Sequence, residues 1–157
     1  MPDNQPFPGL AQGFRGQLVC PADGAYEDTR KLYNGMIDKR PQLIARCADV
    51  ADVIAAVNFG REKGMRIAIR GGGHNGPGLG SVDDGLVIDM SAMTGVRVDP
   101  VARTARVAAG CTQGDLDHAT HVFGLATPAG IISTTAAQCP EQVRIVALGR
   151  RHKAAVG

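Results

Sequence analysis

A glycine-rich run at residues 70–80 restricts the fold more than any other feature of this chain. Six of its eleven residues are glycine, and His74 stands in the middle. Glycine has no Cβ, so backbone N–H groups in such a run can turn inward and approach a ligand closely. Successive inward N–H groups form a concavity that suits phosphate. Glycine clusters also mark plain turns, so the neighbouring segments must decide between a ligand loop and a turn.

The segments before the run predict a strand, a helix and a second strand. Residues 42–46 have the pattern of a strand, and residues 65–70 alternate like a half-buried one. A helix is expected between these two strands. Asp49 and Asp52 suit its start, and Gly64 suits its end. The i, i+3, i+4, i+7 spacing of apolar residues predicts the buried helix face, made of Val50, Val53, Ile54 and Val57. The glycine run therefore begins at the carboxyl end of a strand, where α/β sheets commonly bind ligands.

The residues after the run predict more short strands and one further helix. Strands are expected at residues 86–88, 96–98 and 104–107, with a turn at Asp99-Pro100. A helix is expected at residues 114–123, and the side chains predicted to face the core are Leu116, Ala119 and Phe123.

A long pattern that ends at the glycine run resembles a known signature. The chain is similar to the N-terminal part of the flavin-linked oxidases of the vanillyl-alcohol oxidase and p-cresol methylhydroxylase (PCMH) type, especially the berberine-bridge-enzyme-like and 6-hydroxynicotine-oxidase-like members. The residues that match their covalent flavin signature are Pro41, Asp52, Val53, Val57, Ile67, Gly71, Gly72, Gly73 and His74. The resemblance continues through residues 85–91, 110–117 and 124–135.

This resemblance implies an α+β fold, the PCMH-type FAD-binding domain. We expect its N-terminal βαβ subdomain and part of the second subdomain, in a truncated form, because the family's next glycine-rich stretch does not follow Thr135. The expected organisation is an N-terminal segment at residues 1–35, an incomplete FAD-binding domain at 36–138 and a divergent basic tail at 139–157.

The resemblance also assigns site residues. His74 matches the histidine that bonds covalently to the 8α-methyl group of the flavin, and the alternative is a loop histidine that only forms hydrogen bonds. The backbone N–H groups expected to bind the pyrophosphate belong to Gly71, Gly72, Gly73 and Asn75. Arg70 is expected either to neutralise phosphate charge or to be an ordinary surface arginine.

Two further segments are assigned by the same comparison. The residues that match the segment passing the flavin ring and adenosine are Gly130, Ser133, Thr134 and Thr135, and the alternative is a strand and turn rich in small residues. Some relatives attach the flavin through a cysteine as well, but their cysteine aligns near Ile132, not at Cys111. We therefore expect a single covalent bond, with Cys111 as a small buried residue.

For the complete parent, the resemblance implies oxidation of a small organic substrate, with hydride transfer to flavin N5 and reoxidation by oxygen. The substrate-binding and catalytic residues are expected in a domain absent here, so none is named. Two alternatives remain, a non-catalytic flavin-binding remnant and a non-covalent FAD reductase of the same fold.

Composition excludes several other classes. A net charge of +2 and few aromatic residues argue against a nucleic-acid surface. No apolar run reaches the roughly 20 residues that a membrane span needs, and we expect a cytoplasmic protein. His118 and His121 lack a convincing third ligand, so no metal site is expected, and they are assigned with Asp115 and Asp117 to a solvated helix face.

Overall fold

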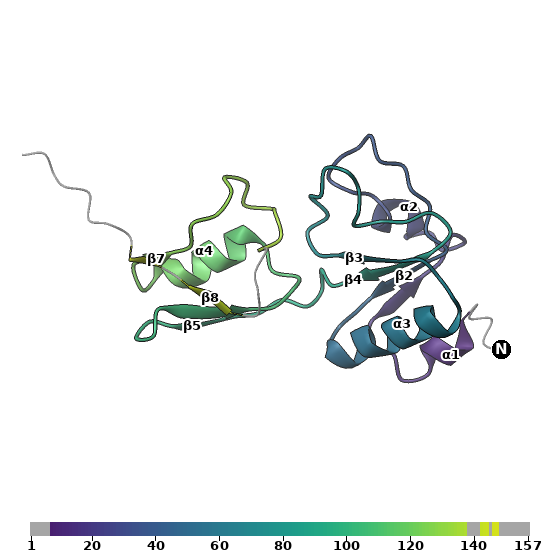
Figure 1. The fold of residues 1–157 in the computed structure, drawn as a ribbon, viewed down its shortest axis with the longest axis horizontal. Coiled ribbons are helices and arrows are strands. Elements are labelled where there is room, and N and C mark those ends of the chain that lie inside the picture. Colours follow the sequence, from purple (N-terminus) through teal and green to yellow (C-terminus); the bar gives the residue numbers. More distant parts are fainter. Residues whose placement is uncertain (1–6, 138–141, 145, 148–157) are drawn as a thin grey trace, which may run out of the picture.

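The computed structural model describes residues 7–137, 142–144 and 146–147 as two lobes (Figure 1). The N-terminal lobe contains α1 (Pro8–Ala11), β1 (Gln17–Val19), α2 (Tyr26–Thr29), β2 (Leu43–Arg46), α3 (Val50–Glu62), β3 (Ile67–Arg70) and β4 (Leu86–Asp89). The C-terminal lobe contains β5 (Val96–Asp99), β6 (Thr104–Val107), α4 (Gln113–His121), β7 (Leu125–Ala126), β8 (Gln142–Arg144) and β9 (Val146–Ala147). The mixed α+β composition confirms the predicted fold class.

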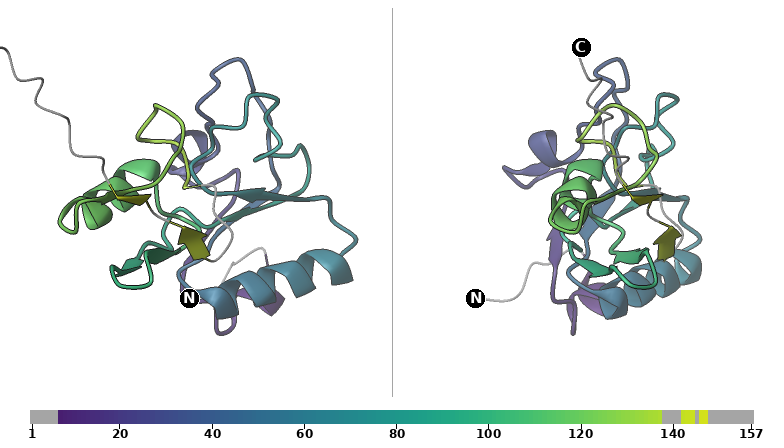
Figure 2. Two further views of the ribbon diagram at one scale, coloured as in Figure 1. Left: turned by 60° about the vertical axis from the view of Figure 1, so that its left-hand side comes forward. Right: turned by 90° about the vertical axis from the view of Figure 1, so that its left-hand side faces the viewer.

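The four-stranded sheet of the N-terminal lobe has the order β1-β2-β4-β3. β2, β3 and β4 are parallel, and β1 is antiparallel to β2. α1 and α3 pack on one face, as Figure 2 shows, while Tyr26 of α2 packs on the other. Because both faces are covered, all four residues of β4 are buried, which explains its continuous apolar sequence.

The helix predicted after Asp49 is present, but only half of its predicted buried face is right. Val53 and Val57 are partly buried and pack against the core. Val50 and Ile54 are 64% and 56% exposed. The buried residues of α3 are Asp52, Ala56, Phe59 and Gly60, a stripe of the same period rotated around the helix. Small residues decide this rotation, because a Cβ on Gly60 would lie 2.7 Å from Ile67 Cδ1 and push the helix away from the sheet.

Asp52 fixes the start of α3 from inside the lobe. Its carboxylate accepts hydrogen bonds from the backbone N–H groups of Arg15, Gly16 and Ala48, at 2.8 to 2.9 Å. Burial raises the pKa of Asp52, but these three donors outweigh it and hold the pKa below its ordinary value. This signature residue therefore stabilises the fold and lies apart from the glycine-rich run.

The C-terminal lobe packs α4 against the β5–β6 hairpin and β7. β6 pairs with β5 on one side and with β8 on the other, both antiparallel. Leu116 is buried as predicted, but Phe123 is 49% exposed because α4 ends at His121 and Gly124 turns the chain with φ +65°. Most of the tail predicted at 139–157 lies outside the described residues.

Among the described residues, no helix combines the length and the apolar character needed to cross a membrane.

Candidate functional site

The glycine-rich run begins where β3 ends, beside the carboxyl ends of β2 and β4. It also contacts the C-terminal lobe. A Cβ on Gly72 would lie 2.7 Å from the backbone nitrogen of Ala136, and one on Gly71 would lie 3.0 Å from the carbonyl oxygen of Ala109. Gly73 has φ +71°. Glycine is thus required here by the close approach of two backbones and by a left-handed turn.

The backbone N–H groups of residues 71–75 are free to bind an anion. No hydrogen bond among the described residues uses any of these five donors. Cavities of about 380 and 500 Å³ border the run, and both include Gly71, Gly72 and Gly73 in their walls. A run of donors without protein partners beside a cavity is an arrangement that suits an anion, and the assignment of this run to the pyrophosphate stays a prediction.

His74 is held between two segments far apart in the sequence. Its Nε2 lies 3.1 Å from the hydroxyl oxygen of Thr134. The ring of Tyr33 stacks on the imidazole with 4.0 Å between centroids and 21° between planes. The structure thus brings together His74 and Thr134 of the predicted site and adds Tyr33. Sequence reasoning missed Tyr33 because it lies in the N-terminal segment, to which no signature residue belongs.

Tyr33 belongs to a segment that we call the strap, residues 30–41, which lies over the glycine-rich run. The Tyr33 N–H donates to the Gly73 carbonyl at 3.2 Å. Asn34 Nδ2 donates to the Gly76 carbonyl at 3.0 Å. Lys39 Nζ donates to the carbonyls of Gly78 and Ser81 at 2.8 and 3.0 Å. The strap is therefore fastened to the run along its length.

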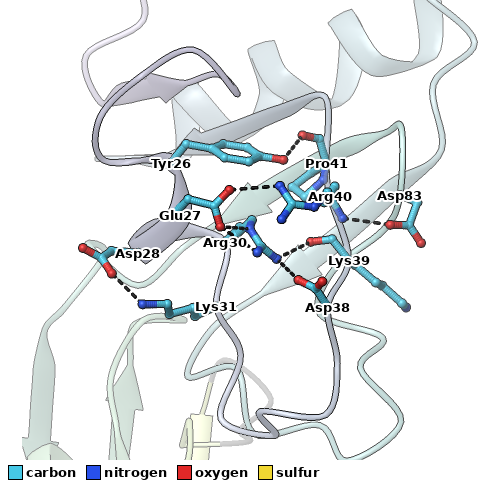
Figure 3. Close-up of polar contacts among 10 residues, drawn as sticks. All are labelled: Tyr26, Glu27, Asp28, Arg30, Lys31, Asp38, Lys39, Arg40, Pro41 and Asp83. Carbon is cyan, nitrogen blue, oxygen red and sulfur yellow. Dashed lines mark hydrogen bonds and ion pairs between the residues drawn. The ribbon is translucent and has the colours of Figure 1, made fainter.

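Ion pairs fasten the strap to α2, and a backbone hydrogen bond fastens it to the turn before β4 (Figure 3). Arg30 pairs with Glu27 at 2.6 Å and also with Asp38. Arg40 pairs with Glu27 at 2.9 Å, and its backbone N–H donates to Asp83 Oδ1 at 2.8 Å. Hydrogen bonds from Arg30 keep the pKa of both Glu27 and Asp38 below their ordinary values.

Arg70 is buried, so the alternative of a surface arginine is wrong. Only 6% of it is exposed, and its Nη2 lies 2.6 Å from Asp89 Oδ2. The side chain points inward because burial alternates along β3, which leaves Ile69 60% exposed in the wall of the smaller cavity. Asp89 already balances the charge of Arg70, and Arg70 Nη1 reaches the Lys31 carbonyl at 3.4 Å.

Arg46 supplies a second cation at the same strand ends. Its Nε is buried, makes no hydrogen bond among the described residues, and lies 3.9 Å from Asp89 Oδ2. Arg46 borders the larger cavity together with the glycines of the run. Its side chain is 40% exposed, so its positive charge at the cavity is a second feature that suits an anionic ligand.

The remaining residues predicted for the site, Gly130, Ser133 and Thr135, differ in whether they border a cavity. The carbonyls of Ser133 and Thr135 accept hydrogen bonds from the N–H groups of Gly114 and Gln113, both at 2.8 Å, which ties this segment to the start of α4. Thr135 borders the smaller cavity. Gly130 is exposed and borders neither cavity.

Cys111 is 1% exposed, which confirms that it is a small buried residue. Its Sγ accepts a hydrogen bond from the Gly95 N–H at 3.0 Å and donates to the Gly95 carbonyl at 3.3 Å. His118, His121, Asp115 and Asp117 are exposed on α4, as expected for a solvated helix face. The described residues include no group of three or more potential metal ligands.

The profile of a protein family described as "FAD binding domain" matches residues 41–154. Among curated proteins, (R)-6-hydroxynicotine oxidase of Paenarthrobacter nicotinovorans is 33% identical over 118 residues, which are 75% of this chain and 26% of the oxidase. Aclacinomycin-N/aclacinomycin-A oxidase of Streptomyces galilaeus is 36% identical over 130 residues, covering 78% of this chain and 24% of the oxidase.

Solved structures give the same result. A crystal structure of the 6-hydroxy-D-nicotine oxidase of Arthrobacter nicotinovorans superposes with a TM-score of 0.76 and 32% identity, over 78% of this chain and 27% of that one. The structure of BBE-like 1 of Physcomitrella patens superposes with a TM-score of 0.74 and 31% sequence identity. The match covers 81% of this chain and 28% of that one. The chain thus spans about a quarter of the length of the relatives it matches. These similarities confirm the predicted resemblance.

Proposed function

Because this chain belongs to the FAD-binding-domain family, we propose that it holds FAD at the glycine-rich run and bonds the flavin covalently through His74. The observation that carries the proposal is the row of five N–H groups at residues 71–75, including that of His74, for which the described part of the chain offers no acceptor. The pyrophosphate is held by these donors, and Arg46 adds positive charge to the same cavity.

The chemistry proposed for the whole protein is that of an oxidase. FAD held at this site would supply hydride-acceptor chemistry for a small organic substrate, with dioxygen as the final electron acceptor and hydrogen peroxide as its product. The names of the relatives, a nicotine-derivative oxidase and an aclacinomycin oxidase, support a small organic substrate. In this chemistry, the residues of this chain bind the cofactor and fix its orientation.

Each residue has a defined share in that task. Residues 71–75 bind the phosphates, and the contact of Gly72 with residue 136 keeps the two lobes closed around the site. His74 anchors the ring, so the flavin cannot dissociate. Thr135 and Ile69 border the smaller cavity, where they limit the access of water to a bound ring.

The test is acid precipitation of the protein after expression with flavin available. We expect flavin fluorescence in the washed pellet of the wild type and none in that of His74→Ala. His118→Ala is the matched control, because His118 is an exposed histidine on α4 and should keep the flavin. A colourless pellet under a yellow supernatant contradicts covalent attachment. Absence of flavin from the pellet and from the supernatant of the wild type contradicts the proposal as a whole.

A further inference from the structure

The imidazole of His74 has a defined neighbour on one face and another at one ring nitrogen. Tyr33 covers the face, and the hydroxyl of Thr134 lies 3.1 Å from Nε2. The hydrogen bonds among the described residues leave Nδ1 without a partner. A ring restrained in this way can present only one nitrogen, Nδ1, to a ligand.

We propose that Tyr33 and Thr134 are positioning residues that clamp the His74 ring so that Nδ1 is the atom that bonds to the flavin. This inference rests on the proposed function and assigns a role that no comparison provides. Tyr33 lies outside residues 41–154, the part of the chain that the family profile matches.

Tyr33 has the features of a group placed for this purpose. It is 64% exposed, so it does not serve the core, yet its position is fixed by its own N–H bond to Gly73, the residue before His74. The strap is also anchored to the glycine-rich run after Tyr33, by the side chains of Asn34 and Lys39. A stacked ring at this separation resists rotation of the imidazole about its Cβ–Cγ bond.

Thr134 has the chemistry that the ring needs before and after the bond forms. A hydroxyl can accept or donate a hydrogen bond. With the imidazole proton on Nε2, the hydroxyl accepts from Nε2–H and the Nδ1 lone pair is available to the flavin. Once Nδ1 carries the flavin, Nε2 has lost its proton and the same hydroxyl donates to it. No main-chain movement is required between the two states.

Formation of the covalent bond is a two-electron oxidation. Joining Nδ1 to the 8α carbon breaks one C–H bond of the methyl group and, overall, the imidazole N–H bond. The two protons and two electrons released are accepted by dioxygen, which becomes hydrogen peroxide. The residues of the clamp supply none of these electrons, so their effect is on the geometry and tautomer of the imidazole alone.

The first experiment uses the flavin-free protein, and therefore tests the clamp without the cofactor. Long-range ¹H–¹⁵N spectra of the imidazole should show one His74 tautomer with the proton on Nε2, and ring proton signals shifted by the Tyr33 ring. We expect Tyr33→Leu to abolish that shift and Thr134→Val to mix the tautomers. Tyr33→Phe and Thr134→Ser should both resemble the wild type.

The second experiment measures attachment. The rate at which acid-stable flavin accumulates after FAD is added should fall on the order of tenfold or more in Tyr33→Leu and in Thr134→Val, and recover in Tyr33→Phe and Thr134→Ser. FAD affinity, measured in a His74→Ala background where no bond can form, should change little. NMR of the flavin-bearing peptide should place the 8α carbon on Nδ1.

The outcomes separate the two proposals. Unchanged attachment rates in Tyr33→Leu and Thr134→Val, or linkage through Nε2, overturn the clamp while leaving covalent FAD intact. Loss of FAD affinity equal to the loss of attachment also overturns it, since the residues would then only shape the pocket. Absence of acid-stable flavin from the wild type overturns covalent attachment itself, and with it the role of the clamp.

Discussion

Arg70 and Asp89 occupy paired register positions at the ends of β3 and β4, and their side chains meet 2.6 Å apart in the interior. Asp89 also accepts the Ser91 N–H at 2.9 Å, and Arg70 also reaches the strap at the Lys31 carbonyl. The buried pair therefore connects the sheet to both segments that flank the glycine-rich run. Its role is to hold the walls of the site in place.

Breaking this pair should destabilise the protein. Arg70→Met leaves the Asp89 carboxylate buried without its partner, and we expect the free energy of unfolding to fall by about 3 kcal/mol. Urea denaturation measures the change. Arg97→Met is the control, because Arg97 is exposed on β5 and, among the described residues, makes no side-chain hydrogen bond or ion pair, so the value should shift by less than about 0.5 kcal/mol. Equal effects of the two substitutions would contradict the structural role of the pair.

Asp52 should make stability depend on pH in the acid range. Its pKa is lowered in the folded state, so the stability it contributes is present above the unfolded-state pKa of about 4 and is lost as pH falls through the folded-state value. Denaturation of the wild type and of Asp52→Asn at a series of pH values measures this. The difference between them should be largest near neutrality and shrink below about pH 4.

The control for that series is Asp84→Asn. Asp84 is exposed and has φ +51°, which asparagine tolerates. We expect its pH profile to follow the wild type. A pH dependence that survives in Asp52→Asn would show that another carboxyl group is responsible.

Gly72→Ala should open the site. The new Cβ would lie 2.7 Å from a backbone nitrogen and 3.1 Å from the Thr134 carbonyl oxygen, so the two backbones must separate. We expect acid-stable flavin to be lost and stability to fall by about 2 kcal/mol. Gly76→Ala is the matched control in the same run, because no atom lies within 4 Å of the added Cβ. If both variants retain flavin equally, the close approach is not required.

Cys111 should be dispensable for attachment. Its thiol is fully occupied by the backbone of Gly95. Cys111→Ala should keep acid-stable flavin at the wild-type level while the free energy of unfolding falls by about 1 kcal/mol. Tryptic peptides of the wild-type protein should carry flavin only on the one that contains His74. Flavin on a cysteine peptide would contradict the single bond.

Several elements of the fold could be predicted from the sequence because their signals are local. The strand before residue 71, the cap at Asp49 and the turn at Gly64 each depend on neighbours within a few residues. Val50 and Ile54 were wrongly placed on the buried face of α3 for the opposite reason. Its orientation is set by contacts of Asp52 with residues 15 and 16 and of Gly60 with β3, none of which the helix pattern contains.

The sequence by itself determined that a glycine-rich loop carrying His74 follows a strand, because backbone freedom and strand periodicity are properties of short segments. Only the tertiary structure decided what surrounds that histidine. Tyr33 and Thr134 are 41 and 60 positions away along the chain, and they reach the imidazole because the strap and the segment before Ala136 both pack against the loop. The burial of Arg70 was decided in the same way, since it depends on Asp89 in the neighbouring strand.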